Sequence, residues 1–209
     1  MSAVTVLGIA GTVQTGKSEL APMFVECGWN YLDLNDPQCD LRAEGTDRYS
    51  MFMSQFPGCL KPCGSKTGTF YDVVTPDFYH ARVAEDLELV VPPVREWLSA
   101  QTGPSIIAWE YLPLIAHNLP IDHTLLFVSD EQIWMERLRT RLRGRGAVGD
   151  ITDERIRKAI DLLDVWPSKI RADAEKQLPG RFSTFDVSGP DWGVESLRPL
   201  LKQLQTTGM

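Results

Sequence analysis

The sequence has few of the residues that build metal centres and disulfide frameworks. Its 209 residues include only 3 histidines and 4 cysteines, which are Cys27, Cys39, Cys59 and Cys63. Only the last two cysteines are close in sequence, and no histidine stands at metal-ligand spacing from them. This pattern favours free thiols in a reducing compartment over a structural zinc site.

Long apolar runs and an excess of basic residues are also missing. No run approaches the roughly 20 apolar residues of a membrane-spanning helix, and no basic stretch typical of a signal peptide precedes the first apolar run. We therefore expect a cytoplasmic protein without a membrane partner. The 21 Lys and Arg residues are outnumbered by 28 Asp and Glu residues, which gives a net charge of −7. That balance disfavours broad nucleic-acid affinity, although it does not exclude a local basic groove.

One segment carries a specific motif. Residues 11–18 read GTVQTGKS and match the pattern G-x-x-x-x-G-K-[ST] of the phosphate-binding P-loop. The β-branched apolar run Val4 to Ala10 precedes the motif, and Glu19 to Cys27 follows it with helical spacing of apolar residues. Strand, glycine loop and helix are the context that this motif requires. We therefore predict a nucleoside triphosphate site rather than a glycine-rich turn with an exposed lysine.

Each part of the motif has a physical task. Successive backbone N–H groups form a concavity for phosphate oxygens, and the helix adds its positive N-terminal end. The Lys17 ammonium is expected to reach the β- and γ-phosphates, and the Ser18 hydroxyl is expected to ligate Mg²⁺. We predict ATP and Mg²⁺ as cofactors. The predicted triphosphate-binding residues are Gly11, Thr12, Val13, Gln14, Thr15, Gly16, Lys17, Ser18 and Glu19.

Further short apolar runs predict the other strands of a sheet. They are Trp29–Leu34, Ser105–Trp109, Thr124–Val128 and Arg181–Val187. Helical stretches separate them, which indicates an α/β fold: a three-layer α/β/α arrangement around a five-stranded parallel sheet. The expected helices are Phe78–Leu89, interrupted by Pro92-Pro93, then Val94–Ala100, Ser129 to about Leu142 with a Ser129–Gln132 capping box, Thr152–Val165, Ser168–Gln177 and Trp192–Leu204.

Two carboxylates follow predicted strands, at the sheet edge where parallel folds bind ligands. Asp33 ends the second strand and could face the γ-phosphate, or it could be a turn or capping residue before Asn35-Asp36-Pro37. Glu110 ends the third strand and could hold Mg²⁺ through water, orient the acceptor, or contact a loop. Position in the sequence leaves these alternatives open.

An arginine-rich segment follows the fourth predicted strand. Its arginines are Arg137, Arg139 and Arg141 on the helix, then Arg143 and Arg145 in a glycine-rich exit. A helix that leads into such a turn is typical of a phosphoryl-transfer lid, in which arginines neutralise charge on the transferring phosphate. The alternative is a solvated basic face. The P-loop elsewhere in the chain favours the lid.

These features together resemble dephospho-coenzyme A kinase, within the nucleoside-monophosphate-kinase-like group of P-loop kinases. The similarity runs patchily over residues 4–142 and lies in Gly8–Gly11 with Lys17-Ser18, Tyr31–Asp33, Leu87–Pro93, Glu110–Ile115, and the series Asp122, Leu125–Val128, Gln132, Arg137 and Arg141. The resemblance implies that Asp33 accepts or orients the proton of the acceptor hydroxyl and that Arg141 acts from the lid. It also implies that the acceptor is held between Asp33 and Ser105. We take Asp33, Arg42 and Glu110 as candidate acceptor-binding residues, with Ser18 and Glu110 as candidate metal ligands.

The sequence departs from this family on the acceptor side. The family's second aspartate is Asn35 here, its histidine before proline is Pro92, and the acidic residue that closes its Pro-Leu-Leu turn is Ala116. The central segment with Cys59 and Cys63 has no counterpart in the family pattern. The nucleotide side is intact, so the sequence predicts a kinase more firmly than it predicts the acceptor.

We therefore expect one P-loop kinase domain over residues 1–209. Its core is expected at about 1–37 and 104–209, with an acceptor-binding insertion at about 38–103 and a lid at about 141–152. The expected activity is ATP-dependent phosphoryl transfer to a hydroxyl of a nucleotide-like small molecule, most like dephospho-coenzyme A.

Two alternatives to this activity stay open. One is a virus-type kinase that acts on a hydroxymethylated pyrimidine in DNA or on a deoxynucleotide, because the aromatic-rich central segment would suit an extruded, stacked base. The acidic net charge counts against a DNA polymer as the acceptor. The other is a nucleotide-binding switch without phosphoryl transfer, although the Asn-Lys-x-Asp motif that reads guanine is missing from the sequence.

Overall fold

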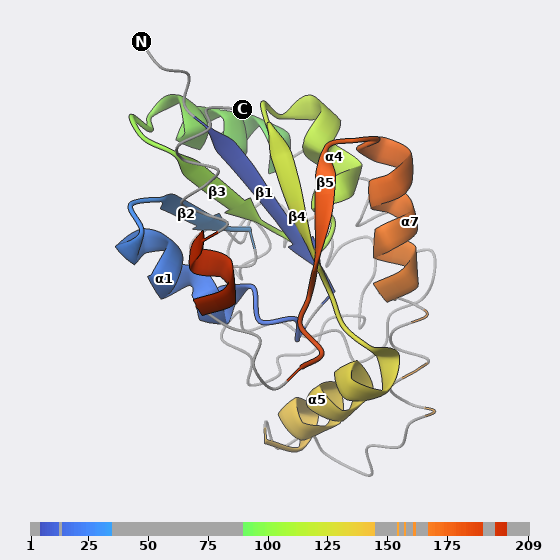
Figure 1. Cartoon of the computed structure of the whole chain (residues 1–209). Coiled ribbons are helices and arrows are strands. Elements are labelled where there is room, and N and C mark those ends of the chain that lie inside the picture. The colour runs from blue at the N-terminus through green and yellow to red at the C-terminus, as the bar shows by residue number, and fades with distance from the viewer. Residues whose placement is uncertain are drawn as a thin grey trace, which may run out of the picture.

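The chain folds around one parallel β-sheet (Figure 1). The computed structural model describes residues 5–12, 14–34, 90–144, 154, 157, 161, 167–189 and 195–199, with the backbone alone at 141–144. The strands are β1 (Val6–Gly11), β2 (Asn30–Asp33), β3 (Ser105–Ala108), β4 (His123–Val128) and β5 (Phe182–Asp186). Neighbouring strands pair in parallel in the order β2-β3-β1-β4-β5. The predicted α/β fold with a five-stranded parallel sheet is confirmed.

β1 is the central strand, and its composition suits that place. All six residues of VLGIAG are buried, as expected for a strand that is covered on both faces. Its side chains alternate, so that Leu7 and Ile9 pack on one face of the sheet while Val6 and Ala10 pack on the other. Because β3 and β4 flank β1, the loop that follows Gly11 leaves from the middle of the sheet.

Helices cover both faces of the sheet (Figure 1). The described helices of one face are α1 (Ala21–Glu26) and residues 195–199, and those of the other face are residues 90–99, α4 (Leu112–Ile115) and α7 (Pro167–Gln177). Phe24 of α1 and Leu197 share a buried cluster with Leu7 of β1. The chain therefore forms the three layers that the alternation of strands and helices predicts.

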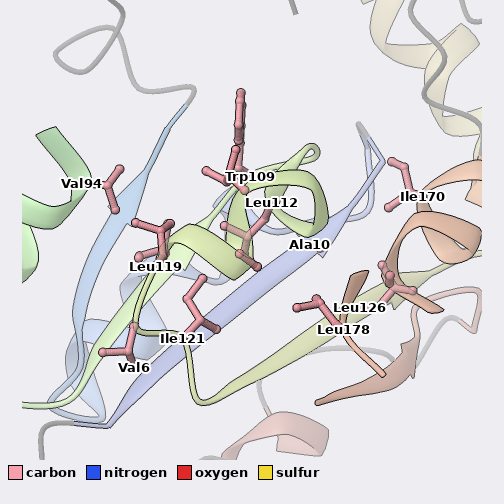
Figure 2. Packing of buried hydrophobic residues seen from close by; sticks show 14 of the residues in the cluster. Val6, Ala10, Val94, Trp109, Leu112, Leu119, Ile121, Leu126, Ile170 and Leu178 are labelled. Atoms are coloured by element: carbon pink, nitrogen blue, oxygen red, sulfur yellow. The ribbon is translucent and has the colours of Figure 1, made fainter. Parts of the chain in front are cut away.

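The larger buried cluster lies between the sheet and the α4 and α7 layer. In Figure 2, Val6 and Ile121 lie together at one end of β1. Packing is close at Gly8, where a Cβ atom would lie 2.7 Å from Leu112 Cδ2 and 2.8 Å from Thr124 Oγ1. Glycine at this position lets the α4 layer approach the sheet.

α5 (Glu131–Gly144) begins with a different cap from the one that the sequence predicts. Asp130 Oδ1 accepts hydrogen bonds from the backbone N–H groups two and three residues further on, at 2.9 and 3.2 Å. The N-cap is therefore Asp130, and the predicted Ser129–Gln132 capping box is wrong. The Asp130 N–H donates to Ser188 Oγ at 2.7 Å, which joins the start of α5 to the loop after β5.

Two prolines that were expected to interrupt a helix lie inside one. Residues 90–99 are all helical, so Pro92 and Pro93 do not break the segment. Val91 and Val94 of this segment are buried in the larger cluster. Such packing supplies most of the stability of a helix in a protein, so it can offset the hydrogen bonds that the two prolines remove. The predicted interruption is wrong.

Other predictions concern residues outside the described part of the chain. These are the helix Phe78–Leu89, the insertion up to residue 89, the lid beyond residue 144, and the individual residues Val13, Cys39, Arg42, Cys59 and Cys63. Residues 154, 157 and 161 are helical, within the helix expected at 152–165. Among the described helices, none is long and apolar enough to cross a membrane.

Candidate functional site

The loop after β1 turns tightly at several of its described residues. Gly11, Gln14 and Gly16 have positive φ angles of 141°, 64° and 79°. Gly11 has no room for a side chain, because a Cβ atom would lie 2.7 Å from the backbone oxygen of Phe127 in β4. A positive φ at the non-glycine Gln14 costs about 1 kcal/mol or more, so the surrounding loop must hold that residue in place.

Lys17 points back into this loop and is buried. Its side chain is 7% exposed, and its Nζ donates to Gly11 O at 2.6 Å and to Thr12 O at 2.8 Å. A longer contact joins Nζ to Thr15 Oγ1 at 3.5 Å, and Thr15 Oγ1 itself donates to Thr12 O at 2.8 Å. The loop therefore surrounds an ammonium group, which differs from the exposed lysine of an ordinary turn.

Ser18 and Asp33 meet across the edge of the sheet. Ser18 Oγ donates to Asp33 Oδ2 at 2.6 Å. Asp33 is the last residue of β2, so its carboxylate stands at the carboxyl end of the strand, as the sequence predicts. The structure thus brings together two predicted site residues from different elements. Their roles in metal binding and catalysis stay predictions.

The oxygens of this pair suit magnesium. Mg²⁺ prefers hard oxygen ligands, and it binds through one or two protein groups together with phosphates and waters. A serine hydroxyl beside a carboxylate, at the end of the predicted phosphate-binding loop, matches that chemistry. In the described part of the chain, no group of three or more His, Cys, Asp and Glu side chains could hold a metal ion. A metal at this site would therefore depend on Ser18, on Asp33 and on the phosphates of a bound nucleotide.

The helix after the loop does not begin as a regular α-helix. A 3₁₀ turn, η1 (Ser18–Leu20), precedes α1, whereas the sequence predicts a continuous helix over Glu19–Cys27. The cause is Pro22, which has no N–H to donate to Ser18 O in an α-helical pattern. The Ala21 N–H donates to Ser18 O instead, which tightens the turn.

Tyr31 is a site neighbour that the sequence analysis did not assign a role. Its hydroxyl donates to Lys17 O at 3.2 Å, and its ring stacks on Phe24 with centroids 5.7 Å apart. Burial raises the pKa of Tyr31 well above its ordinary value, and the nearby Asp33 charge raises it further. The hydroxyl therefore keeps its proton and acts as a donor. The alternation of β-strand side chains could have found it, because Tyr31 and Asp33 are two residues apart and share a face of β2.

Glu110 lies at the same edge of the sheet as Asp33. Asp33 pairs with Ala108, and Glu110 follows two residues later, half-buried. It stands between Trp109 and Tyr111, whose rings pack edge to face with centroids 5.3 Å apart. Its proposed contacts with metal or acceptor stay predictions.

The arginines of α5 make different contacts. Arg137 Nη2 donates to Val187 O at 2.7 Å, which anchors α5 to the chain just after β5. Arg139 pairs with Glu136 at 3.7 Å on the helix surface. Only the backbone of Arg141, in the last turn of α5, is described. Arg137 is therefore an anchor in this structure, and Arg141 stays the predicted lid arginine.

A brace between loops lies at the same end of the sheet. Ser188 accepts a hydrogen bond from the Asp130 N–H, while its own N–H donates to Asp186 Oδ1 at 2.8 Å. Hydrogen bonds from Ser188 lower the pKa of Asp186. These hydrogen bonds hold the loop after β4 beside the loop after β5. The contact between Asp130 and Ser188 was not predictable from the sequence, because no motif links the two residues.

No family model and no curated protein matches the sequence. Solved structures do match the fold. TT1252 from Thermus thermophilus is 18% identical over 96% of this chain and 98% of that chain, with a TM-score of 0.55. A candidate kinase from Chloroflexus aurantiacus is 12% identical over 100% of both chains, with a TM-score of 0.51. At such identities the likeness shows the fold alone: an α/β fold built on a parallel five-stranded sheet with helices on both faces.

Proposed function

We propose that the protein is an ATP-dependent, magnesium-requiring kinase that phosphorylates a hydroxyl of a nucleotide-like acceptor. The observation that carries this proposal is the 2.6 Å hydrogen bond between Ser18 and Asp33 beside the buried ammonium of Lys17. A phosphate-binding loop alone indicates nucleotide binding. A carboxylate placed against its Ser18 adds the group that positions a metal or an acceptor hydroxyl.

Lys17 and the loop amides form the donor side of this site. Among the described contacts of the ammonium, the one to Thr15 Oγ1 is the longest, so it is the contact that a phosphate oxygen would most easily replace. Ser18 would hold Mg²⁺, which would supply positive charge to stabilise the phosphate oxygens. The chain's own contribution is then positioning and electrostatic stabilisation.

Asp33 forms the acceptor side of the site. Its carboxylate stands at the end of β2, next to the residue that would hold the metal, and can orient the attacking hydroxyl and accept its proton. Glu110 of the neighbouring strand end is the candidate second carboxylate. Arg141 is the candidate cation that would close over the transferring phosphate, and the core, insertion and lid boundaries given above belong to the same proposal.

Exchange of Asp33 for Asn tests this assignment. If Asp33 handles the acceptor proton, kcat should fall by about 100-fold or more while the affinity for ATP changes by less than about threefold. Steady-state kinetics and calorimetric ATP titration measure the two quantities, with Ser183→Ala as a control at the opposite end of the sheet. Unchanged transfer would remove Asp33 from the mechanism. ATP binding by the wild type without transfer to any acceptor would favour the nucleotide-binding switch.

The acceptor is proposed from the resemblance to dephospho-coenzyme A kinase. Dephospho-coenzyme A is the first candidate, because the similarity includes the strand that ends in Asp33 and the segment after Glu110. A hydroxymethylated pyrimidine in DNA or a free deoxynucleotide is the alternative, because Asn35, Pro92 and Ala116 depart from the family on the acceptor side. Labelled ATP offered with each acceptor distinguishes them by the product that carries the label. Label in none of them would exclude all three named substrates.

A further inference from the structure

β2 holds two consecutive residues of the loop at once. Tyr31 OH donates to Lys17 O at 3.2 Å, and Ser18 Oγ donates to Asp33 Oδ2 at 2.6 Å. Tyr31 and Asp33 are two residues apart, so both side chains leave the same face of the strand. The peptide that joins Lys17 to Ser18 is therefore fixed to β2 from both of its ends.

The first turn of the helix explains why the Lys17 carbonyl receives a side-chain donor. In an α-helix the N–H of Ala21 would donate to Lys17 O, four residues earlier. Here that N–H donates to Ser18 O, because the turn is 3₁₀ and Pro22 supplies no N–H. Tyr31 provides the donor that regular helix geometry would have supplied.

Fixing this carbonyl also fixes the group on the other side of the same peptide. The peptide unit is planar and trans, so the Lys17 C=O and the Ser18 N–H point in opposite directions. The N–H groups of the first turn point out of the helix N-terminus, towards a bound phosphate. The Tyr31 hydroxyl therefore sets the direction of the Ser18 N–H and the place from which the Ser18 hydroxyl extends.

The tyrosine is itself held in one orientation. Its ring stacks on Phe24 of α1, with the two ring planes 17° from parallel, and Phe24 is fully buried. A rigid ring with one hydroxyl at its tip suits the task of placing a hydrogen bond. We propose that Tyr31 is a positioning residue, which aligns the Lys17–Ser18 peptide with Asp33 for a magnesium-bound triphosphate. This inference rests on the proposed function only in taking the loop as a site for Mg²⁺ and ATP.

A double-mutant cycle tests the proposal by binding rather than by turnover. The affinity for ATP in saturating Mg²⁺ is measured calorimetrically for the wild type, Tyr31→Phe, Ser18→Ala and the double variant. Tyr31→Phe keeps the stacked ring and removes one hydrogen bond, so affinity should fall about three- to tenfold. In the Ser18→Ala background the same change should weaken binding by a smaller factor, because the Ser18 hydroxyl that Tyr31 places is missing and only the Ser18 N–H remains.

A merely structural role would give a different result. It would lower the melting temperature of Tyr31→Phe and weaken binding by the same factor in both backgrounds, and that outcome would overturn the proposal. Unchanged affinity in Tyr31→Phe would also overturn it. Ser183→Ala, which removes a hydroxyl from the distant half of β5, should bind as the wild type does. Binding by the wild type without phosphoryl transfer would overturn the kinase proposal alone, whereas no binding at all would overturn both.

Discussion

Gly8 and Gly11 lie three residues apart in β1, and each is required for a different reason. Gly11 has a φ angle of 141° and stands against the backbone of Phe127, so both conformation and space exclude a side chain. Gly8 has no such backbone constraint, and only the closeness of Leu112 and Thr124 limits it. Gly11 therefore shapes the loop, and Gly8 sets the distance between two layers of the fold.

Exchange of Gly8 for Ala should destabilise the protein by about 1–3 kcal/mol through overpacking. The added methyl would meet Leu112 Cδ2 at 2.7 Å and Thr124 Oγ1 at 2.8 Å, and both of these side chains are fully buried. Urea unfolding measures the loss. Gly103→Ala is the matched control, because the nearest atom to its new methyl would be Asn30 Nδ2 at 3.7 Å. Equal stability of the two variants would contradict this account of the packing.

The residues of the candidate site differ in how well the sequence predicts them. Lys17 and Ser18 belong to a local motif, so their placement in the loop follows from eight consecutive residues. Asp33 meets Ser18 across 15 residues of chain, and its position at a strand end was predictable although its partner was not. Strand alternation places Tyr31 on the same face as Asp33, but its hydrogen bond was not predictable because the partner is a backbone carbonyl, which no residue type identifies.

At the scale of elements, apolar runs predict strands well and helix ends poorly. β1, β3 and β4 were predictable because a buried parallel strand needs a short, continuous apolar run. The ends of helices depend on which of several adjacent polar groups reaches a backbone N–H. Ser129 and Asp130 are both good caps, and the tertiary contact of Asp130 with Ser188 favours the second. The 3₁₀ turn before α1 likewise depends on a single proline.

Exchange of Asp130 for Ala should destabilise the protein by about 1 kcal/mol, because two N–H groups at the start of α5 would lose their acceptor. Ser129→Ala is the informative control. The hydrogen bond described for the Ser129 hydroxyl is a long one, to Asp130 O at 3.3 Å. Loss of this hydroxyl should therefore destabilise the protein less than loss of the Asp130 carboxylate. Unfolding in urea compares the two variants. A larger loss of stability in Ser129→Ala than in Asp130→Ala would favour the Ser129–Gln132 capping box over the Asp130 cap.

At the scale of the whole molecule, the site joins parts that are distant in sequence. The loop follows β1. Asp33 and Tyr31 belong to β2, and Glu110 follows β3. A ligand that touches all of these would stabilise the folded chain, because it binds only when the sheet is assembled. The acceptor region could not be derived in the same way. Its predicted residues are separated from any recognisable motif, and one of them, Arg42, lies outside the described part of the chain.

Magnesium and ATP together should therefore raise the melting temperature. At a concentration about 100 times the dissociation constant, binding adds about 2.7 kcal/mol, which corresponds to roughly 5–10 °C for a chain of this size. Thermal unfolding with and without ligand measures the shift. Removal of Mg²⁺ by a chelator should reduce it, and Lys17→Ala should abolish it. An equal shift in Lys17→Ala would place the nucleotide elsewhere on the protein.

The strand order gives the site two halves of unequal rigidity. β1 is paired on both sides and fully buried, whereas β2 stands at one end of the described sheet with all four residues only half-buried. Amide hydrogens exchange slowest where opening requires global unfolding, and faster at the margins of a sheet. The amide hydrogens of β1 should thus exchange more slowly than those of β2. The donor loop is anchored to the most protected strand, while Tyr31 and Asp33 lie on one that can fray, so nucleotide binding should slow exchange most in β2.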